Sequence, residues 1–252
     1  MSDLPLSTMI ACGAGLVALP LAFRWDRRAA TVELPAQRVD GSGLLFIAVA
    51  LLLLQQVLLF AGLRAVAEDR IVLGRVLLGV PLVVCIAMAV KLLPYVVTSK
   101  LTALRAIAAG LVAVLAALPL VYGTAWLMTL LFGDQPAQQL VSVLAKRETG
   151  WREIAFVAVV LAPVSEELVF RGFFYPTLRR MRGAPFGLIA SSVLFGIVHF
   201  DPWTAIFPLF VFGLVLARLM EKTGSYLACV TAHVAFNALT VGTVLLSEST
   251  SL

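Results

Sequence analysis

Residues 161–180 read LAPVSEELVFRGFFYPTLRR, an apolar stretch that contains Glu166, Glu167 and Arg171. A charge at the centre of a membrane span costs about 2.5–3.5 kcal/mol on insertion scales, so a charge that a span retains is read as functional by default. Glu167 and Arg171 are four residues apart with the acid first, the favourable order for a helical ion pair. Glu166 lies about 100° further round the helix, so we expect its carboxylate to stay free and to face a cavity. From this stretch alone, a cluster of helical ion pairs without chemistry is an equal alternative.

The composition around this stretch is that of a membrane protein. Of the 252 residues, 61% are hydrophobic and 13% are charged, and the mean hydropathy is +1.02. Soluble domains average about 45–50% apolar and about 25% charged residues. The composition therefore excludes a disordered chain, a disulfide scaffold and almost any soluble globular fold, and the continuous apolar runs disfavour a transmembrane β-barrel. We predict an all-α fold, a polytopic helical bundle in the membrane.

Polar residues divide the chain into about eight apolar segments, most of them long enough to span a bilayer. A polar connection from Gly133 to Trp151 separates residues 1–150, read as N-terminal transmembrane helices, from residues 151–246, read as a catalytic helical core. The predicted segments lie near residues 7–23, 43–63, 71–97, 103–132, 153–182, 185–200, 203–220 and 226–246.

The net charge of +5 does not indicate nucleic-acid binding. The basic residues stand between the apolar segments, where they set topology and contact lipid headgroups. We therefore expect an integral multi-pass protein with membrane lipid as a partner, placed in the plasma (inner) membrane if the source is bacterial.

Both histidines of the chain lie in the C-terminal part. His199 ends the sixth segment, and His233 lies in the eighth, four residues before Asn237 and on the same helix face. With a rise of about 1.5 Å per residue, Glu166, His199, His233 and Asn237 fall roughly 24, 21, 12 and 18 Å from one membrane surface. Tilt makes these depths uncertain by about 5 Å, so the four side chains can share one layer. Pro163 is expected to bend its helix, and we predict a polar pocket inside the bundle.

These residue types suit the hydrolysis of an amide bond. A glutamate in an apolar site can act as the general base for a water molecule, and histidine and asparagine can stabilise an oxyanion. A serine nucleophile (Ser165, Ser191 or Ser192) is a weaker alternative, because no G-x-S-x-G motif surrounds these residues. Zinc held by one glutamate and two histidines is a further alternative, although the H-E-x-x-H motif is absent.

Three ordered motifs resemble those of a known family. EELVFR fits E-E-x-x-x-R, FGIVH fits F-x-x-x-H and HVAFN fits H-x-x-x-N, all within about residues 150–245. The chain resembles the CPBP (Abi) family of type II CAAX prenyl protease-like and bacteriocin-processing intramembrane proteases.

That resemblance implies a role for each motif residue. Glu166 would activate water with help from His199, and His233 and Asn237 would form the oxyanion pair. Glu167 and Arg171 would support the site or contact substrate. The resemblance implies an endopeptidase without a metal or other cofactor, acting on a peptide or protein that is lipidated or membrane-anchored. Prenylated C-termini, leader or sorting signals and bacteriocin immunity all occur among the family's associations, and the sequence selects none of them.

Two other classes of function stay open at this stage. A non-catalytic immunity or scaffold protein would use the same pocket for binding. A proton-coupled transporter would use the glutamate and histidine groups as a relay. Transporters often have repeated halves, whereas the two halves of this chain differ chemically, which counts against the transporter.

Overall fold

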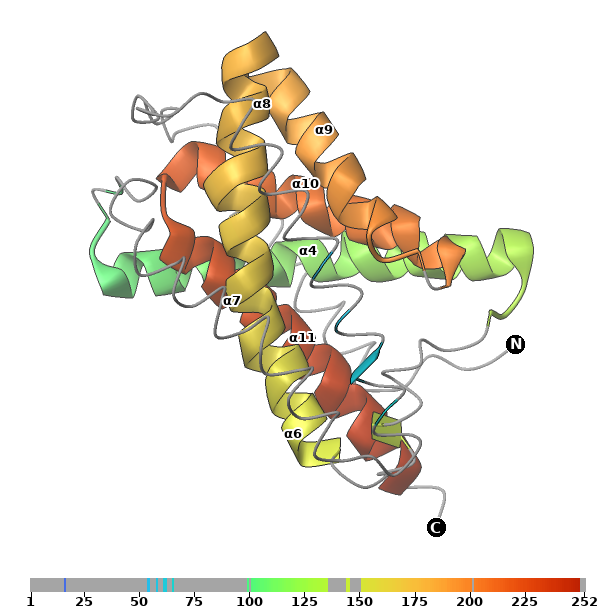
Figure 1. Ribbon diagram of the computed structural model, residues 1–252. Coiled ribbons are helices and arrows are strands. Elements are labelled where there is room, and N and C mark those ends of the chain that lie inside the picture. The colour runs from blue at the N-terminus through green and yellow to red at the C-terminus, as the bar shows by residue number, and fades with distance from the viewer. Residues whose placement is uncertain are drawn as a thin grey trace.

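The computed structural model describes residues 101–135, 151–200 and 202–249, together with a few isolated positions elsewhere. Within these ranges the chain folds into helices joined by short turns, which confirms the all-α class (Figure 1). Five of the predicted segments fall in the described ranges, and helices cover them to within a few residues. The segments predicted at 7–23, 43–63 and 71–97, and most of the polar connection before Trp151, lie outside the described residues.

The segment predicted at 153–182 is one helical rod, residues 151–182, in which α-helix and π-helix alternate. It consists of α6 (Trp151–Phe156), η1 (Val157–Leu161), α7 (Ala162–Glu167), η2 (Leu168–Phe174) and α8 (Tyr175–Arg182). The two π-helical pieces flank α7, which carries both glutamates. π-helical turns inside α-helices are uncommon overall, but those that occur are often found at functional sites. The two π-helical pieces therefore mark this rod as a candidate functional element.

Among the described residues, three further long helices pack against the rod, and a fourth packs against two of these three. The three are α9 (Ala184–Ile197), α10 (Ile206–Thr223), which follows the 3-10 turn η3 (Trp203–Ala205), and α11 (Tyr226–Ser249). The fourth is α4 (Ala103–Phe132), which packs against α10 and α11. In Figure 1, α11 runs beside α6 and α7, while α4 lies behind the rod in this view, against α10 and α11.

Tight turns with glycine join the successive helices of this part. Gly183 between α8 and α9 has φ 87°, and Gly224 between α10 and α11 has φ 58°, a conformation that glycine adopts without strain. The amide of Gly183 donates to the Arg179 carbonyl, and that of Gly224 donates to the Met220 carbonyl, so each turn satisfies an open carbonyl at a helix end. The first turn folds α9 back against α8, and the second folds α11 back against α10.

Three of the described helices are long and apolar enough to cross a membrane: 103–132, 203–223 and 226–246. The helix α9 is apolar but shorter. Large apolar side chains on α4 remain exposed, among them Leu104 at 76% and Leu130 at 65%. Such a surface suits contact with acyl chains, whereas in water it would be an aggregation hazard.

One hydrophobic core joins α4 to the C-terminal helices. Ala117 and Leu118 of α4 are fully buried in the same cluster as Phe170 of the rod, Phe212 of α10 and Ala232 of α11. The helix α4 therefore packs as part of the unit that carries the glutamates. The functional division at residue 150 stays a prediction.

Candidate active site

Prolines explain the two π-helical pieces of the rod. In η1 the amide of Ala162 donates to the carbonyl of Val157, five residues back, and Pro163 follows directly. A proline in a regular α-helix has no N–H to donate, and its ring clashes with the carbonyl four residues earlier. The sequence predicts that Pro163 disrupts its helix. In the structure this disruption is a π-helical turn, which is wider than a regular α-helical turn. The same register precedes the proline of α8, where the Tyr175 amide donates to the Phe170 carbonyl.

Glu166, His199 and His233, three of the four residues that the depth argument allowed to share one layer, meet at one point. The Oε2 atom of Glu166 lies 3.8 Å from Nε2 of His199 and 3.7 Å from Nε2 of His233. Direct hydrogen bonds are shorter, at about 2.7–3.2 Å. The carboxylate and the two ring nitrogens therefore converge without consuming one another's hydrogen-bonding capacity, and a water molecule or a substrate can use it. The Glu166 side chain is 11% exposed, so the point is largely shielded.

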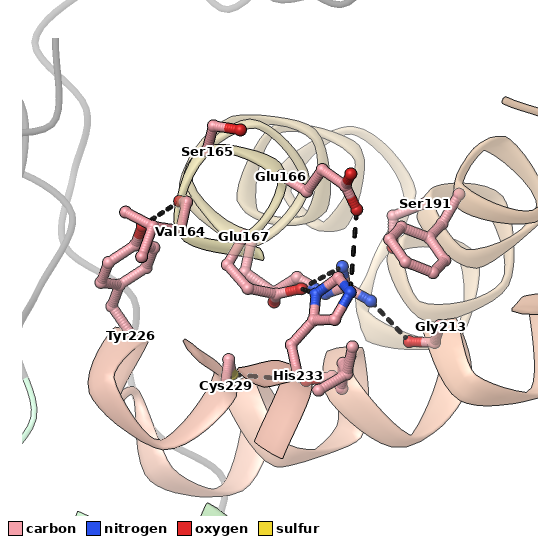
Figure 2. Close-up of polar contacts among 12 residues, drawn as sticks. Val164, Ser165, Glu166, Glu167, Ser191, Gly213, Tyr226, Cys229 and His233 are labelled. Carbon is pink, nitrogen blue, oxygen red and sulfur yellow. Dashed lines mark hydrogen bonds and ion pairs between the residues drawn. The ribbon is translucent and has the colours of Figure 1, made fainter. Parts of the chain in front are cut away.

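Glu167 occupies a different environment, one residue further along the rod. Its Oε1 atom accepts from Nη1 of Arg171 at 3.0 Å and lies 2.8 Å from Nδ1 of His233. The Glu167 side chain is fully buried and that of Arg171 is 1% exposed. The predicted ion pair between Glu167 and Arg171 is confirmed, and Figure 2 shows the two glutamates facing His233.

Arg171 also forms a hydrogen bond to the neighbouring helix α10. Its Nη2 donates to the carbonyl of Gly213 in α10 at 3.1 Å. A hydrogen-bonded chain therefore runs from α10 through Arg171 and Glu167 to the ring of His233. Because each link is buried, the chain fixes the rotation of that ring.

The tautomers of the two histidines follow from their partners. Nδ1 of His199 lies 2.8 Å from the Phe195 carbonyl, which only accepts, so this nitrogen carries a proton. Nδ1 of His233 likewise faces the carboxylate of Glu167. In both rings Nε2 is the atom turned to Glu166, and it is the nitrogen available for proton transfer or hydrogen bonding.

Asn237 makes its contact on a separate part of the rod. It lies one turn beyond His233 on α11, and its Nδ2 donates to the carbonyl of Ala158 in η1 at 2.8 Å. The structure thus brings Glu166, His199 and His233 together and places Asn237 against the π-helical turn before them.

Phe195 is a part of the site that sequence reasoning did not single out beyond its spacing from His199. Its ring packs against both imidazoles, with centroids 4.9 Å from His199 and 5.7 Å from His233. The Arg171 guanidinium lies 4.8 Å from the centroid of the same ring. Phe195 is 1% exposed, and its ring contacts both imidazoles and the Arg171 guanidinium. The spacing F-x-x-x-H was the available signal, since residues four apart share a helix face.

The hydroxyl groups of the three serines considered as nucleophiles donate hydrogen bonds to backbone carbonyls of their own helices. Ser165 donates to the Ala162 carbonyl at 2.9 Å, Ser191 to the Gly187 carbonyl at 2.7 Å and Ser192 to the Leu188 carbonyl at 2.6 Å. A nucleophilic serine donates to a base instead.

No group of three or more His, Cys, Asp or Glu side chains suited to a metal ion occurs among residues 101–135, 151–200 and 202–249. A mechanism without a metal ion stays a prediction.

Comparison with known proteins agrees with the class that the motifs suggested. Residues 149–239 match the family described as Type II CAAX prenyl endopeptidase Rce1-like. The chain is also 23% identical over 130 residues to the UPF0177 protein YxdF of Lactococcus lactis subsp. lactis (strain IL1403), covering 44% of this chain and 72% of that protein. No solved structure matches the chain.

The match to the Rce1-like family is confined to residues 149–239, about a third of the chain. The matched region contains both glutamates, both histidines, Arg171 and Asn237. The chain is a membrane protein with the domain of a membrane-protease family, and that family acts on peptide or protein substrates.

Proposed function

We propose that this protein is an intramembrane endopeptidase in which Glu166 activates a water molecule to hydrolyse a peptide bond. The observation that carries the proposal is the convergence of the Nε2 atoms of His199 and His233 on one carboxylate oxygen of Glu166, at 3.8 and 3.7 Å. One reacting centre is therefore within reach of three groups: Glu166 as the general base, His199 as the group that relays the proton, and His233 as the hydrogen-bond donor to the oxyanion.

The reaction begins when Glu166 takes a proton from water. The resulting hydroxide attacks the scissile carbonyl carbon, so that a C–O bond forms and the carbonyl π-electrons move to oxygen. The tetrahedral intermediate collapses when the C–N bond breaks, and the amine leaves with the proton that Glu166 had taken. His199 stands beside Glu166 and helps to orient the water and relay that proton. Atoms and charge balance without a covalent enzyme intermediate.

His233, which lies on α11, stabilises the oxyanion. Donation from its Nε2 while Nδ1 donates to Glu167 requires the imidazolium form of the ring. The carboxylate of Glu167 is the counter-ion for that form, much as the aspartate of a serine-protease triad supports its histidine. Asn237 is the second oxyanion donor in this proposal, with one N–H of its carboxamide directed to the intermediate.

The setting of the enzyme follows from the same proposal. It is a multi-pass protein of the plasma (inner) membrane if the source is bacterial, and its substrate is a lipidated or membrane-anchored peptide. The mechanism needs no metal ion, so incubation with a chelator such as EDTA is expected to leave the rate unchanged. A chelator-sensitive rate that zinc restores would replace the glutamate mechanism by a zinc one.

The test compares peptide termini in membrane and secreted proteins of the native host, with the wild-type chain and with Glu166→Gln. A defined set of cleavages is expected to disappear in the variant. The matched control is Glu153→Gln, which changes an exposed glutamate on the same rod and is expected to leave every terminus as in wild type. Unchanged termini with Glu166→Gln at normal protein level would contradict the protease proposal and favour a binding or transport role.

A further inference from the structure

A side-chain hydrogen bond joins Asn237 of the H-x-x-x-N motif to Ala158 in the first π-helical turn. The Nδ2 atom of Asn237 donates to the Ala158 carbonyl at 2.8 Å, across 79 residues of sequence. Ala158 is 6% exposed and Asn237 is half-buried, so the bond is largely shielded from water.

The Ala158 carbonyl is available because of a proline. The Ala162 amide donates to Val157, five residues back. In that register the Ala158 carbonyl would accept from residue 163, and Pro163 has no N–H. Ala158 is buried, and a buried carbonyl left without a partner costs about 1–3 kcal/mol, so another donor is required. Asn237 supplies that donor.

This bond also selects the orientation of the asparagine side chain. A carboxamide has an oxygen and an NH₂ group at nearly equal positions, and it can place either one toward a neighbour. Two carbonyl oxygens cannot hydrogen-bond to each other, so the Ala158 oxygen holds the NH₂ group toward the rod. One N–H is then bound and the other is fixed in direction.

We propose that Pro163 is a positioning residue for Asn237. By withholding a backbone N–H, Pro163 presents the Ala158 carbonyl to Asn237. This contact keeps the second N–H of the carboxamide aimed as an oxyanion donor. The inference rests on the role given to Asn237 in the proposed function, and it explains why the π-helical turn and the proline precede the glutamates.

The first measurement needs no substrate. Asn237 is the only asparagine in the chain, so selective ¹⁵N-labelling of asparagine gives a single side-chain NH₂ pair in an NMR spectrum of the full-length protein in detergent micelles. In the wild type we expect two well-separated protons, one of them protected from exchange with water. Rapid exchange of both protons in the wild type would overturn the inference without any variant, even if Pro163→Ala does not fold.

The variant Pro163→Ala restores an N–H that competes for the Ala158 carbonyl. The protected Asn237 proton should then exchange about tenfold faster, the ratio expected for the loss of about one hydrogen bond. The matched control is Pro119→Ala, a proline inside α4, which should leave the Asn237 signals unchanged. An unchanged Asn237 pair in Pro163→Ala would overturn the inference.

The second measurement uses a peptide spanning a cut site found in the comparison of termini. Pro163→Ala should lower kcat by about tenfold or more with KM unchanged, since loss of a whole oxyanion donor costs about 10²–10³. The double variant Pro163→Ala/Asn237→Ala should be no slower than Asn237→Ala alone. Normal kcat in a Pro163→Ala protein whose Asn237 proton has lost protection would overturn the positioning role. If the wild type cleaves no peptide while the NMR result holds, the positioning of Asn237 by Pro163 and Ala158 stands, and the proposed function fails.

Discussion

The Nδ1 atom of His233 lies 2.8 Å from Oε1 of Glu167, and the same oxygen accepts from Arg171 at 3.0 Å. The two adjacent glutamates of the EE pair therefore differ in their surroundings. Glu167 is fully buried and holds a ring, whereas Glu166 is the carboxylate that both imidazoles face. In the proposed mechanism, Glu167 positions His233 and Glu166 reacts with water.

Replacement of Glu167 by glutamine should impair the positioning of His233 and leave the Glu166 carboxylate in place. Glu167→Gln keeps the shape of the side chain but removes the counter-charge for the imidazolium form of His233. We expect kcat to fall by about 10²–10⁴, because loss of the orienting carboxylate in a comparable triad costs about 10⁴. KM should change little, since Glu167 is buried away from substrate. The measurement is cleavage of a peptide that spans an identified cut site, with insertion checked by circular dichroism.

Glu153→Gln is the control for Glu167→Gln, because it makes the same chemical change at an exposed position of α6. Equal activity of the Glu167→Gln variant and the control would mean that the ring orientation of His233 is not set by Glu167.

Much of this site follows from spacing along one helix. The separation of four residues predicted the Glu167–Arg171 pair, and the different angular position of Glu166 predicted that it would not share Arg171. Composition and apolar run length predicted the all-α class, and the helices from Ala103 onward lie where the apolar segments are. The depth estimates allowed Glu166, His199, His233 and Asn237 to share one layer. The structure brings the first three together, whereas Asn237 bonds to the Ala158 carbonyl.

What could not be predicted depends on rotation between helices and on backbone groups. The contact of Glu167 with His233 joins residues 66 positions apart, and its existence is decided by how α11 is turned against the rod. The acceptors at Gly213 and Ala158 are main-chain carbonyls, which every residue possesses and which therefore leave no mark in a sequence. The π-helical register likewise appears only once Pro163 is placed in three dimensions.

Arg171 should be irreplaceable by lysine. Its guanidinium contacts Glu167 through Nη1 and the Gly213 carbonyl through Nη2, a two-directional contact that a single ammonium group cannot reproduce. Arg171→Met leaves the Glu167 carboxylate buried without its cation, and breaking a buried pair in this way costs about 3–5 kcal/mol. We expect a clear drop in the thermal unfolding midpoint in detergent for Arg171→Met and a smaller one for Arg171→Lys.

A double variant tests the physical reason for the Arg171 prediction. Arg171→Met/Glu167→Gln removes both charges and should unfold at a higher temperature than Arg171→Met alone. If the two losses simply add, an uncompensated charge is not what destabilises the single variant.

Gly196 should be required for the placement of His199. A Cβ atom at Gly196 would lie 2.5 Å from the backbone oxygen of Ile206, where the end of α9 meets the start of α10. Backbone cannot yield as a side chain does, so Gly196→Ala should force the two helices apart at a cost of about 1–3 kcal/mol. His199 lies just after α9 and should move with it, which lowers kcat. Gly242→Ala is the control, because a Cβ there meets nothing within 4 Å. It should stabilise α11 by about 0.5–1 kcal/mol, so equal unfolding midpoints for the two variants would refute the close-approach argument.

Glu221 should matter for stability and not for chemistry. It is 1% exposed in α10, accepts a hydrogen bond from the Tyr175 hydroxyl, and accepts from Arg179 Nη2 at 3.0 Å, so it ties α10 to α8. Tyr175→Phe leaves the buried carboxylate short of one donor, and such a loss costs about 1–3 kcal/mol. We expect a lower unfolding midpoint for Tyr175→Phe and Glu221→Gln, and an unchanged kcat per folded molecule at a temperature well below the midpoint. A fall in kcat without loss of folded protein would contradict the prediction, because it would show that the contact of Glu221 with Tyr175 affects the active site.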